Sequence, residues 1–193
     1  MHDSWRAYYE FAKALTEYRA GNHSNAVLWL QRSLGAKPEH LRDTIAPIND
    51  RIYDTFNNGV YKSGFATTQK AYEAAVVPLF ETLDWLESHL SENRFLMGDR
   101  VTEADWRLFP TLVRFDTVYH GHFKCNRRRI VDYPNLWDYT RALYQVPGVA
   151  ETVHMDHITR HYHYSHDTIN PYRIVPIGPV LDFMAPTTRV ATL

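Results

Sequence analysis

Apolar residues recur at steps of three and four along much of the chain, which is the spacing of one face of an α-helix. The clearest run covers residues 68–90 and consists of Ala71, Ala75, Val76, Leu79, Phe80, Leu83, Leu86 and Leu90. Pro78 lies inside this run and should bend the helix. Three further helices are predicted, over about residues 102–119, 135–144 and 149–162. From Ser165 onward four prolines predict an extended tail, and no stretch has a strand pattern. The sequence therefore predicts an all-α fold.

One helix start carries a capping signal. Thr102 is predicted to cap the helix that follows it, and the Asp105 carboxylate can accept a hydrogen bond from the Thr102 amide, as Glu does in a capping box. A lost cap costs about 1 kcal/mol, so we expect Thr102→Ala and Asp105→Ala to destabilise the domain by similar amounts.

The stretch of residues 48–72 would be helical throughout, yet Asn57, Asn58 and Gly59 lie in its middle. Because Gly and Asn are poor helix formers, we expect a local break or a close backbone approach there. The break is flanked by three aromatic residues, Tyr53, Tyr61 and Phe65. Aromatic side chains of this kind can line a small-molecule pocket. The alternative is a kinked core helix with ordinary aromatic packing.

Residues 1–38 have a separate pattern, two amphipathic helices around Gly21-Asn22-His23 with Pro38 at the end. This hairpin resembles a single tetratricopeptide repeat, which has a period of about 34 residues. An ordinary helical hairpin has the same pattern. One repeat cannot bury both faces, so we expect it to pack on the domain over residues 45–193 or on a partner.

Composition fits one ordinary core: the 193 residues are 45% hydrophobic and 22% charged, with a net charge of −1. Near-zero charge gives no electrostatic reason to expect a nucleic-acid or membrane partner. No apolar run has the length of a membrane-spanning helix, and the first residues have no signal-peptide pattern. A single cysteine excludes an internal disulfide, so a cytoplasmic location is expected.

Four segments carry a family resemblance. They are NDRIYDTFNNGVYKSGFA (49–66), FLMGDRVTEAD (95–105), HFKCNRRRIVDYPNLWDY (122–139) and DHITRHYHYSHDTINP (156–171), with IGP at 177–179. Together they resemble the glutathionyl-hydroquinone reductases, a branch of the glutathione transferase superfamily, and they stand in that family's order. The first and third segments are specific to it. The resemblance implies a glutathione transferase C-terminal-like helical bundle, and it covers that domain only.

The family's chemistry uses a cysteine thiolate, normally in a Cys-Pro motif, in a thioredoxin-like domain that these 193 residues do not match. Cys125 is the one cysteine, it is not followed by Pro, and it resembles a cysteine of the family's helical domain. Cations in the run 127–129 could lower its pKa, but we expect a packed, inert thiol. We therefore expect no catalytic residue here and no turnover by the chain alone. Glutathione would be the co-substrate of the intact enzyme, with its main site elsewhere.

The resemblance implies that Tyr61 and Tyr162 bind the hydroquinone ring of an S-glutathionyl-hydroquinone, with Tyr164 as a competitor for the role of Tyr162. A phenol can hydrogen-bond a quinol oxygen. If so, the two hydroxyls should lie within roughly 10 Å, the width of a small-ligand pocket. The alternative for each is a core aromatic with a satisfied hydroxyl.

His154, His157 and His161 share one helix face at a spacing seen among metal ligands. No neighbouring glutamate completes a known motif, and the resembled family uses no metal, so a solvated histidine face is expected. The alternative function from another class is a non-catalytic interaction or scaffold module with the same fold. A homodimer is compatible with either function.

Overall fold

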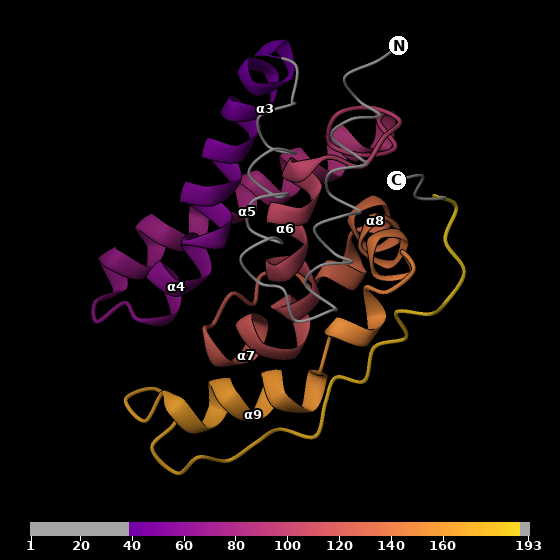
Figure 1. Ribbon diagram of the computed structural model, residues 1–193. Helices are drawn as coiled ribbons and strands as arrows, with labels where there is room; N and C mark the ends of the chain where they lie inside the picture. The colour runs from indigo at the N-terminus through magenta and orange to yellow at the C-terminus, as the bar shows by residue number, and fades with distance from the viewer. Residues whose placement is uncertain (1–38, 190–193) are drawn as a thin grey trace, which may run out of the picture. The chain divides into compact units, whose positions relative to one another are not determined.

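The structure is a computed structural model that describes residues 39–189, and the hairpin and repeat-like pattern predicted for residues 1–38 lie outside them. The chain divides between Pro47 and Ile48 into two units, and the second holds every element from η1 onward. The elements are α3 (Glu39–Arg51), η1 (Ile52–Asn57), α4 (Gly59–Gly64), α5 (Gln69–Glu92), α6 (Glu103–Arg114), η2 (Phe115–Tyr119), α7 (His120–His122), η3 (Ile130–Asp132), α8 (Pro134–Tyr144), η4 (Ala150–Thr152) and α9 (Met155–Ser165). The second unit is a bundle of helices, as predicted, and the described residues contain no strand (Figure 1).

The long helix α5 is the centre of the bundle. Its apolar face buries Leu79, Leu83, Leu86 and Leu90, which are at most 1% exposed. Helix α5 packs against η1, α4 and α8, and α6 packs against η1 and α8. The Thr68 side chain accepts a hydrogen bond from the Ala71 amide and so caps the first turn of α5. These contacts hold α4, α6 and α8 around one buried face.

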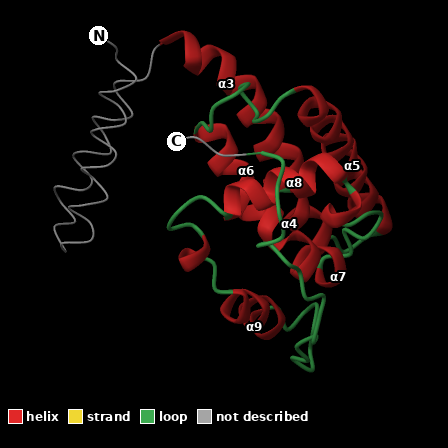
Figure 2. Ribbon diagram, turned by 90° about the vertical axis from the view of Figure 1, so that its right-hand side faces the viewer, coloured by secondary structure: helices red, strands yellow, loops and turns green. Residues whose placement is uncertain are grey.

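The helix predicted over residues 149–162 is wrong at its start. A short 3-10 turn, η4, occupies Ala150–Thr152, and α9 begins only at Met155 and runs to Ser165. Helix α9 lies beside α7 at one end of the unit, and the chain after it doubles back along α9 toward α8 (Figures 1 and 2). Helix α9 packs mainly on η2.

The irregularity at Asn57-Asn58-Gly59 is a π-helix rather than a gap. The π-helix η1 ends at Asn57, the Asn58 amide donates to the Tyr53 carbonyl at 3.0 Å, and α4 begins at Gly59. A side chain at Gly59 would meet Leu79 only at an ordinary van der Waals distance. The close backbone approach is instead at Gly64, where a Cβ would lie 2.3 Å from the Phe123 ring.

The capping element at Thr102 is present, but Asp105 does more than a cap does. Its carboxylate accepts from the Thr102 amide at 2.7 Å and from the Thr102 hydroxyl at 2.9 Å. It also accepts from the Leu96 amide at 3.0 Å and from the Tyr139 hydroxyl at 2.9 Å. Asp105 is fully buried and has two donors outside the capping turn, so we now expect its loss to cost more than the loss of Thr102. A buried carboxylate with four donors joins α6 to α8 and to the preceding turn.

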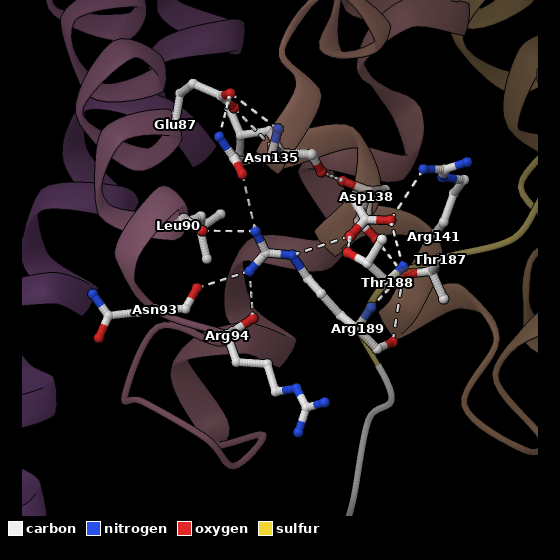
Figure 3. A network of polar contacts seen from close by, with 12 residues as sticks. Glu87, Leu90, Asn93, Arg94, Asn135, Asp138, Arg141, Thr187, Thr188 and Arg189 are labelled. Atoms are coloured by element: carbon white, nitrogen blue, oxygen red, sulfur yellow. Dashed lines mark hydrogen bonds and ion pairs between the residues drawn. The ribbon is translucent and has the colours of Figure 1, made fainter.

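The C-terminal tail is fixed to the bundle by a buried arginine (Figure 3). Arg189 donates to the backbone carbonyls of Leu90, Asn93 and Arg94 at 2.6 to 2.7 Å, in the last turn of α5 and just after it. Its guanidinium also forms an ion pair with Asp138 on α8 at 3.4 Å. The tail therefore connects the end of α5 to the middle of α8.

Over residues 39–189, no helix is long and apolar enough to cross a membrane.

Candidate functional site

Three tyrosine hydroxyls meet at the end of the bundle, although their residues are far apart in sequence. The Tyr61 hydroxyl on α4 lies 2.5 Å from the Tyr162 hydroxyl on α9. The Tyr119 hydroxyl, at the end of η2, lies 2.8 Å from Tyr162 and 3.5 Å from Tyr61. We call these three residues the tyrosine cluster. The prediction that Tyr61 and Tyr162 lie within roughly 10 Å, a pocket's width, is confirmed.

The three hydroxyls make three mutual contacts, and one of these contacts is long. Each phenol has one O–H to donate, so the cluster has three donors. The two short contacts use two of these hydrogens, and the third hydroxyl faces only the longer contact between Tyr61 and Tyr119. The O–H that faces this 3.5 Å contact is weakly held and can turn to an incoming acceptor, such as a ligand oxygen.

Burial differs sharply among the three side chains. Tyr61 is 40% exposed, whereas Tyr162 and Tyr119 are 7% and 2% exposed. Burial, followed by the hydrogen bonds to Tyr162 and Tyr61, raises the pKa of Tyr119 far above its usual value. Burial also raises the pKa of Tyr162 to about 12. Tyr119 and Tyr162 are therefore neutral phenols at physiological pH, and the cluster is open to solvent on the Tyr61 side.

Tyr61 owes its position to the π-helix before it. The Asn57 side chain bridges to α6, because its amide donates to the Arg107 carbonyl at 3.0 Å and accepts from the Thr111 hydroxyl at 3.0 Å. The Thr55 hydroxyl reaches the Thr82 hydroxyl on α5 at 2.7 Å. These contacts fix η1 between α5 and α6, and so set the direction in which α4 carries Tyr61.

Phe123 lies behind the cluster. Its ring stacks on Tyr119 at 5.5 Å and meets Tyr61 and Tyr162 edge-on at 5.4 and 5.9 Å. Gly64 on α4 allows this packing, because a Cβ there would collide with the Phe123 ring. The absence of a side chain at Gly64 is thus a requirement of the site.

Tyr119 is the member that the sequence prediction missed. It lies between Phe115 and Phe123 at steps of four residues, so a stripe of aromatic residues on one face was the available signal. Tyr164, the competitor for the role of Tyr162, is 54% exposed, and no described ring contact or hydrogen bond joins it to the cluster.

Cys125 has the properties of a packed thiol. It is fully buried, and its Sγ lies 3.8 Å from the Phe123 carbonyl. Burial raises the pKa of Cys125 to about 12, against smaller opposing effects of Ser63 and Lys124. The expectation of a packed thiol is confirmed, and the arginines of the run 127–129, which could have lowered this pKa, contact Phe80, Tyr133 and Asp132 instead.

The face of His154, His157 and His161 holds no ligand set. His154 and His157 are exposed with ring centroids 5.4 Å apart. Among the side chains that the structure describes, no three of His, Cys, Asp and Glu are arranged to hold a metal ion. A different group, His122, His163 and His166, lies together beside Phe123.

The fold and the sequence match known proteins. A family model, the glutathione S-transferase C-terminal domain, matches residues 69–142. A glutathionyl-hydroquinone reductase of Sphingobium chlorophenolicum, PcpF, is 60% identical over 74% of this chain and 45% of its own. The glutathionyl-hydroquinone reductase YqjG of Escherichia coli is 54% identical over 81% of this chain and 49% of its own. The glutathione-bound structure of YqjG aligns with a TM-score of 0.80 and 48% identity, over 86% of this chain and 57% of that one.

An all-helical bundle with this family match is the C-terminal domain of a glutathione transferase. Over that domain, the chain is a homologue of glutathionyl-hydroquinone reductases, with 54–60% identity to the two named above. It spans about half the length of the curated relatives it matches.

Proposed function

We propose that this domain binds the aromatic half of an S-glutathionyl-hydroquinone in a glutathione-dependent reductase. The observation that carries the proposal is the tyrosine cluster, in which Tyr61 meets Tyr162 at 2.5 Å across 101 residues of sequence. Nothing local in the chain requires this meeting. An available phenol O–H beside aromatic rings suits a flat ring that carries oxygen acceptors.

The tyrosines would act on the ring and its oxygens. By the family's chemistry, a thiolate bonds to the glutathione sulfur, the bond from that sulfur to the quinol carbon breaks, and its electron pair stays on the ring. A proton then completes the new C–H bond, and a second glutathione releases the mixed disulfide. The neutral hydroxyls of the cluster would donate to a quinol oxygen and stabilise the charge that develops there.

The thiolate is proposed to come from a thioredoxin-like domain outside residues 1–193. A buried thiol with a pKa of about 12 is a poor nucleophile at neutral pH, so the properties of Cys125 support this division. Turnover by the 193-residue chain that disappears in Cys125→Ser would contradict it. Glutathione is then a co-substrate whose contacts we assign to the other domain.

Binding of an S-glutathionyl-hydroquinone to the 193-residue chain, followed by NMR or calorimetry, tests the proposal. Tyr61→Phe should weaken binding by about tenfold, the scale of one lost hydrogen bond to a ligand. Tyr164→Phe is the matched control on α9 and should bind like the unaltered chain. Equal affinities for all three proteins would remove the cluster from the substrate site.

One observation favours a second candidate, an interaction module. The tail exposes a row of apolar side chains, with Ile177 and Val180 more than 90% exposed and Tyr172 at 85%. Apolar patches of this kind often mark association surfaces. Sedimentation of the 193-residue chain distinguishes the interaction module from the substrate-binding domain. The double variant Ile177→Asp with Val180→Asp should dissociate a dimer built on this row and leave quinol binding unchanged.

A further inference from the structure

A histidine group lies directly behind the tyrosine cluster and is not part of it. His122 Nε2, at the end of α7, lies 3.1 Å from Nδ1 of His166, which follows α9. The ring of His163 lies 4.6 Å from that of His122, between centroids. The pair His122–His166 therefore joins α7 to the C-terminal end of the helix that carries Tyr162.

Both rings of the pair also stack on Phe123. The centroid of His122 lies 5.2 Å from that of Phe123, and the centroid of His166 lies 5.5 Å from it. Phe123 is the ring that supports all three tyrosines, and His166 also meets Tyr162 edge-on at 5.6 Å. A displacement of His166 would thus reach Tyr162 both through α9 and through Phe123.

We propose that the hydrogen bond between His122 and His166 is a positioning contact that holds α9 on α7 and keeps Tyr162 within the tyrosine cluster. The inference rests on the proposed function only for the identity of what Tyr162 binds. Besides its packing on η2, α9 is held by the contacts of Tyr162 with Tyr61 and Phe123 and by this histidine contact at its C-terminal end.

This contact depends on protonation. Between two imidazoles one nitrogen donates and the other accepts, so at least one ring has to be neutral. A first proton can be shared across the bond, whereas a second leaves two donors facing each other. The contact should therefore survive the first protonation and break at the second.

The surroundings oppose protonation. Burial, with neighbouring His163, His166 and Lys124, lowers the pKa of His122 to about 4. Burial, with His161 and His163, lowers the pKa of His166. His122 and His163 line a cavity of about 590 Å³ together with Asp116 and His120. The Asp116 carboxylate is held by the amides of Ile130 and Val131, from which it accepts hydrogen bonds at 2.6 and 3.1 Å.

The sign of the pH effect follows. The pKa of His122 lies below the ordinary value of about 6.5, so folded protein binds fewer protons than unfolded protein between that value and about 4. The stabilising contribution is complete above about pH 6.5 and is lost as the pH falls toward 4. Helix α9 should loosen in that window.

Amide hydrogen exchange of the 193-residue chain, without ligand, tests the contact. His122→Ala should lower the protection of α9 amides by about tenfold at neutral pH, with α5 unchanged as the internal reference. The double variant His122→Gln with His166→Asn places neutral amide groups near the same two positions and should restore much of the protection. His154→Gln, on the exposed face, is the matched control and should have no effect.

Acid separates positioning from simple packing. In the unaltered chain, α9 protection should fall relative to α5 as the pH drops from 6.5 toward 4, and in the Gln–Asn variant this step should be absent. A step of equal size in both proteins would overturn the proposal. If a variant does not fold, the pKa of His122 is measured in the unaltered chain by ¹⁵N NMR. A pKa near the ordinary value of about 6.5 overturns the proposal, and a lower pKa supports it.

The two proposals fail separately. If Tyr61→Phe weakens quinol binding but the histidine variants leave amide exchange in α9 unchanged, only the positioning role is lost. If exchange behaves as expected but no variant of the cluster alters quinol binding, the proposed function fails and the contact stands.

Discussion

Two tyrosines of this domain, Tyr139 and Tyr61, use the same side chain for opposite purposes. Tyr139 is fully buried, and its hydroxyl donates to Asp105 at 2.9 Å. Tyr61 is 40% exposed, and its hydroxyl meets only other phenols. Around Asp105 every donor has a close carboxylate oxygen, whereas the third O–H of the tyrosine cluster faces only a contact of 3.5 Å. A complete set of hydrogen bonds stabilises a fold, and an incomplete set beside solvent can receive a ligand.

The comparison predicts that Asp105→Ala has the largest effect on stability. It leaves the Leu96 amide, the Thr102 amide and the Tyr139 hydroxyl without an acceptor, so the free energy of unfolding should fall by about 3 kcal/mol. Thr102→Ala is the matched control and should cost about 1 kcal/mol. Urea unfolding measures both, and equal losses would mean that Asp105 is only a cap.

Arg189→Ala should have the next largest effect, a loss of about 2 kcal/mol in the free energy of unfolding, because it removes a charged donor from three backbone carbonyls and from Asp138. Burial would raise the pKa of Asp138, but hydrogen bonds from Thr188 and Thr187 and the charge of Arg141 lower it overall. A carboxylate with a lowered pKa stabilises the fold above its ordinary pKa, and this contribution is lost as the pH falls through the folded pKa. The difference in the free energy of unfolding between the unaltered chain and Arg189→Ala should therefore become smaller in acid. A difference that stays constant with pH would contradict the role of the ion pair.

Gly64→Ala tests the support of the tyrosine cluster. A Cβ 2.3 Å from the Phe123 ring has to displace it, and overpacking of this kind costs about 1.5 kcal/mol. Gly121→Ala is the control, since a Cβ there meets nothing within 4 Å. Thermal unfolding should separate the two variants, and quinol binding should weaken only in Gly64→Ala. Identical melting temperatures would show that Phe123 can move freely.

Tyr61→Phe should have the smallest effect on folding. Its hydroxyl is half-exposed, so its removal should change the free energy of unfolding by less than about 1 kcal/mol, while ligand affinity falls. A loss as large as that of Asp105→Ala would make the cluster a second structural centre. The combination of weak binding and unchanged stability is what a ligand site requires.

The sequence by itself determined the helices whose signals are local. Helix α5 follows from its apolar spacing and its Thr68 cap, and α8 begins at Pro134 because proline fits the first turn. The quoted segments also determined the family, and with it two members of the tyrosine cluster. The predicted start of the last helix was wrong, because apolar residues at 149–153 have helical spacing but form a 3-10 turn and a short link.

Only the tertiary structure decided which polar groups meet. Asp105 has the same local signal as any helix cap, yet two of its four donors, Leu96 and Tyr139, come from outside its own capping turn. Tyr119 joined the cluster because η2 carries it under α9. The arginines of the run 127–129 do not lower the pKa of Cys125, because each contacts another side chain. Capping and apolar periodicity act within a few residues, so sequence carries them directly. Hydrogen bonds and burial across 30 to 100 residues depend on how the helices pack, and no local pattern encodes them.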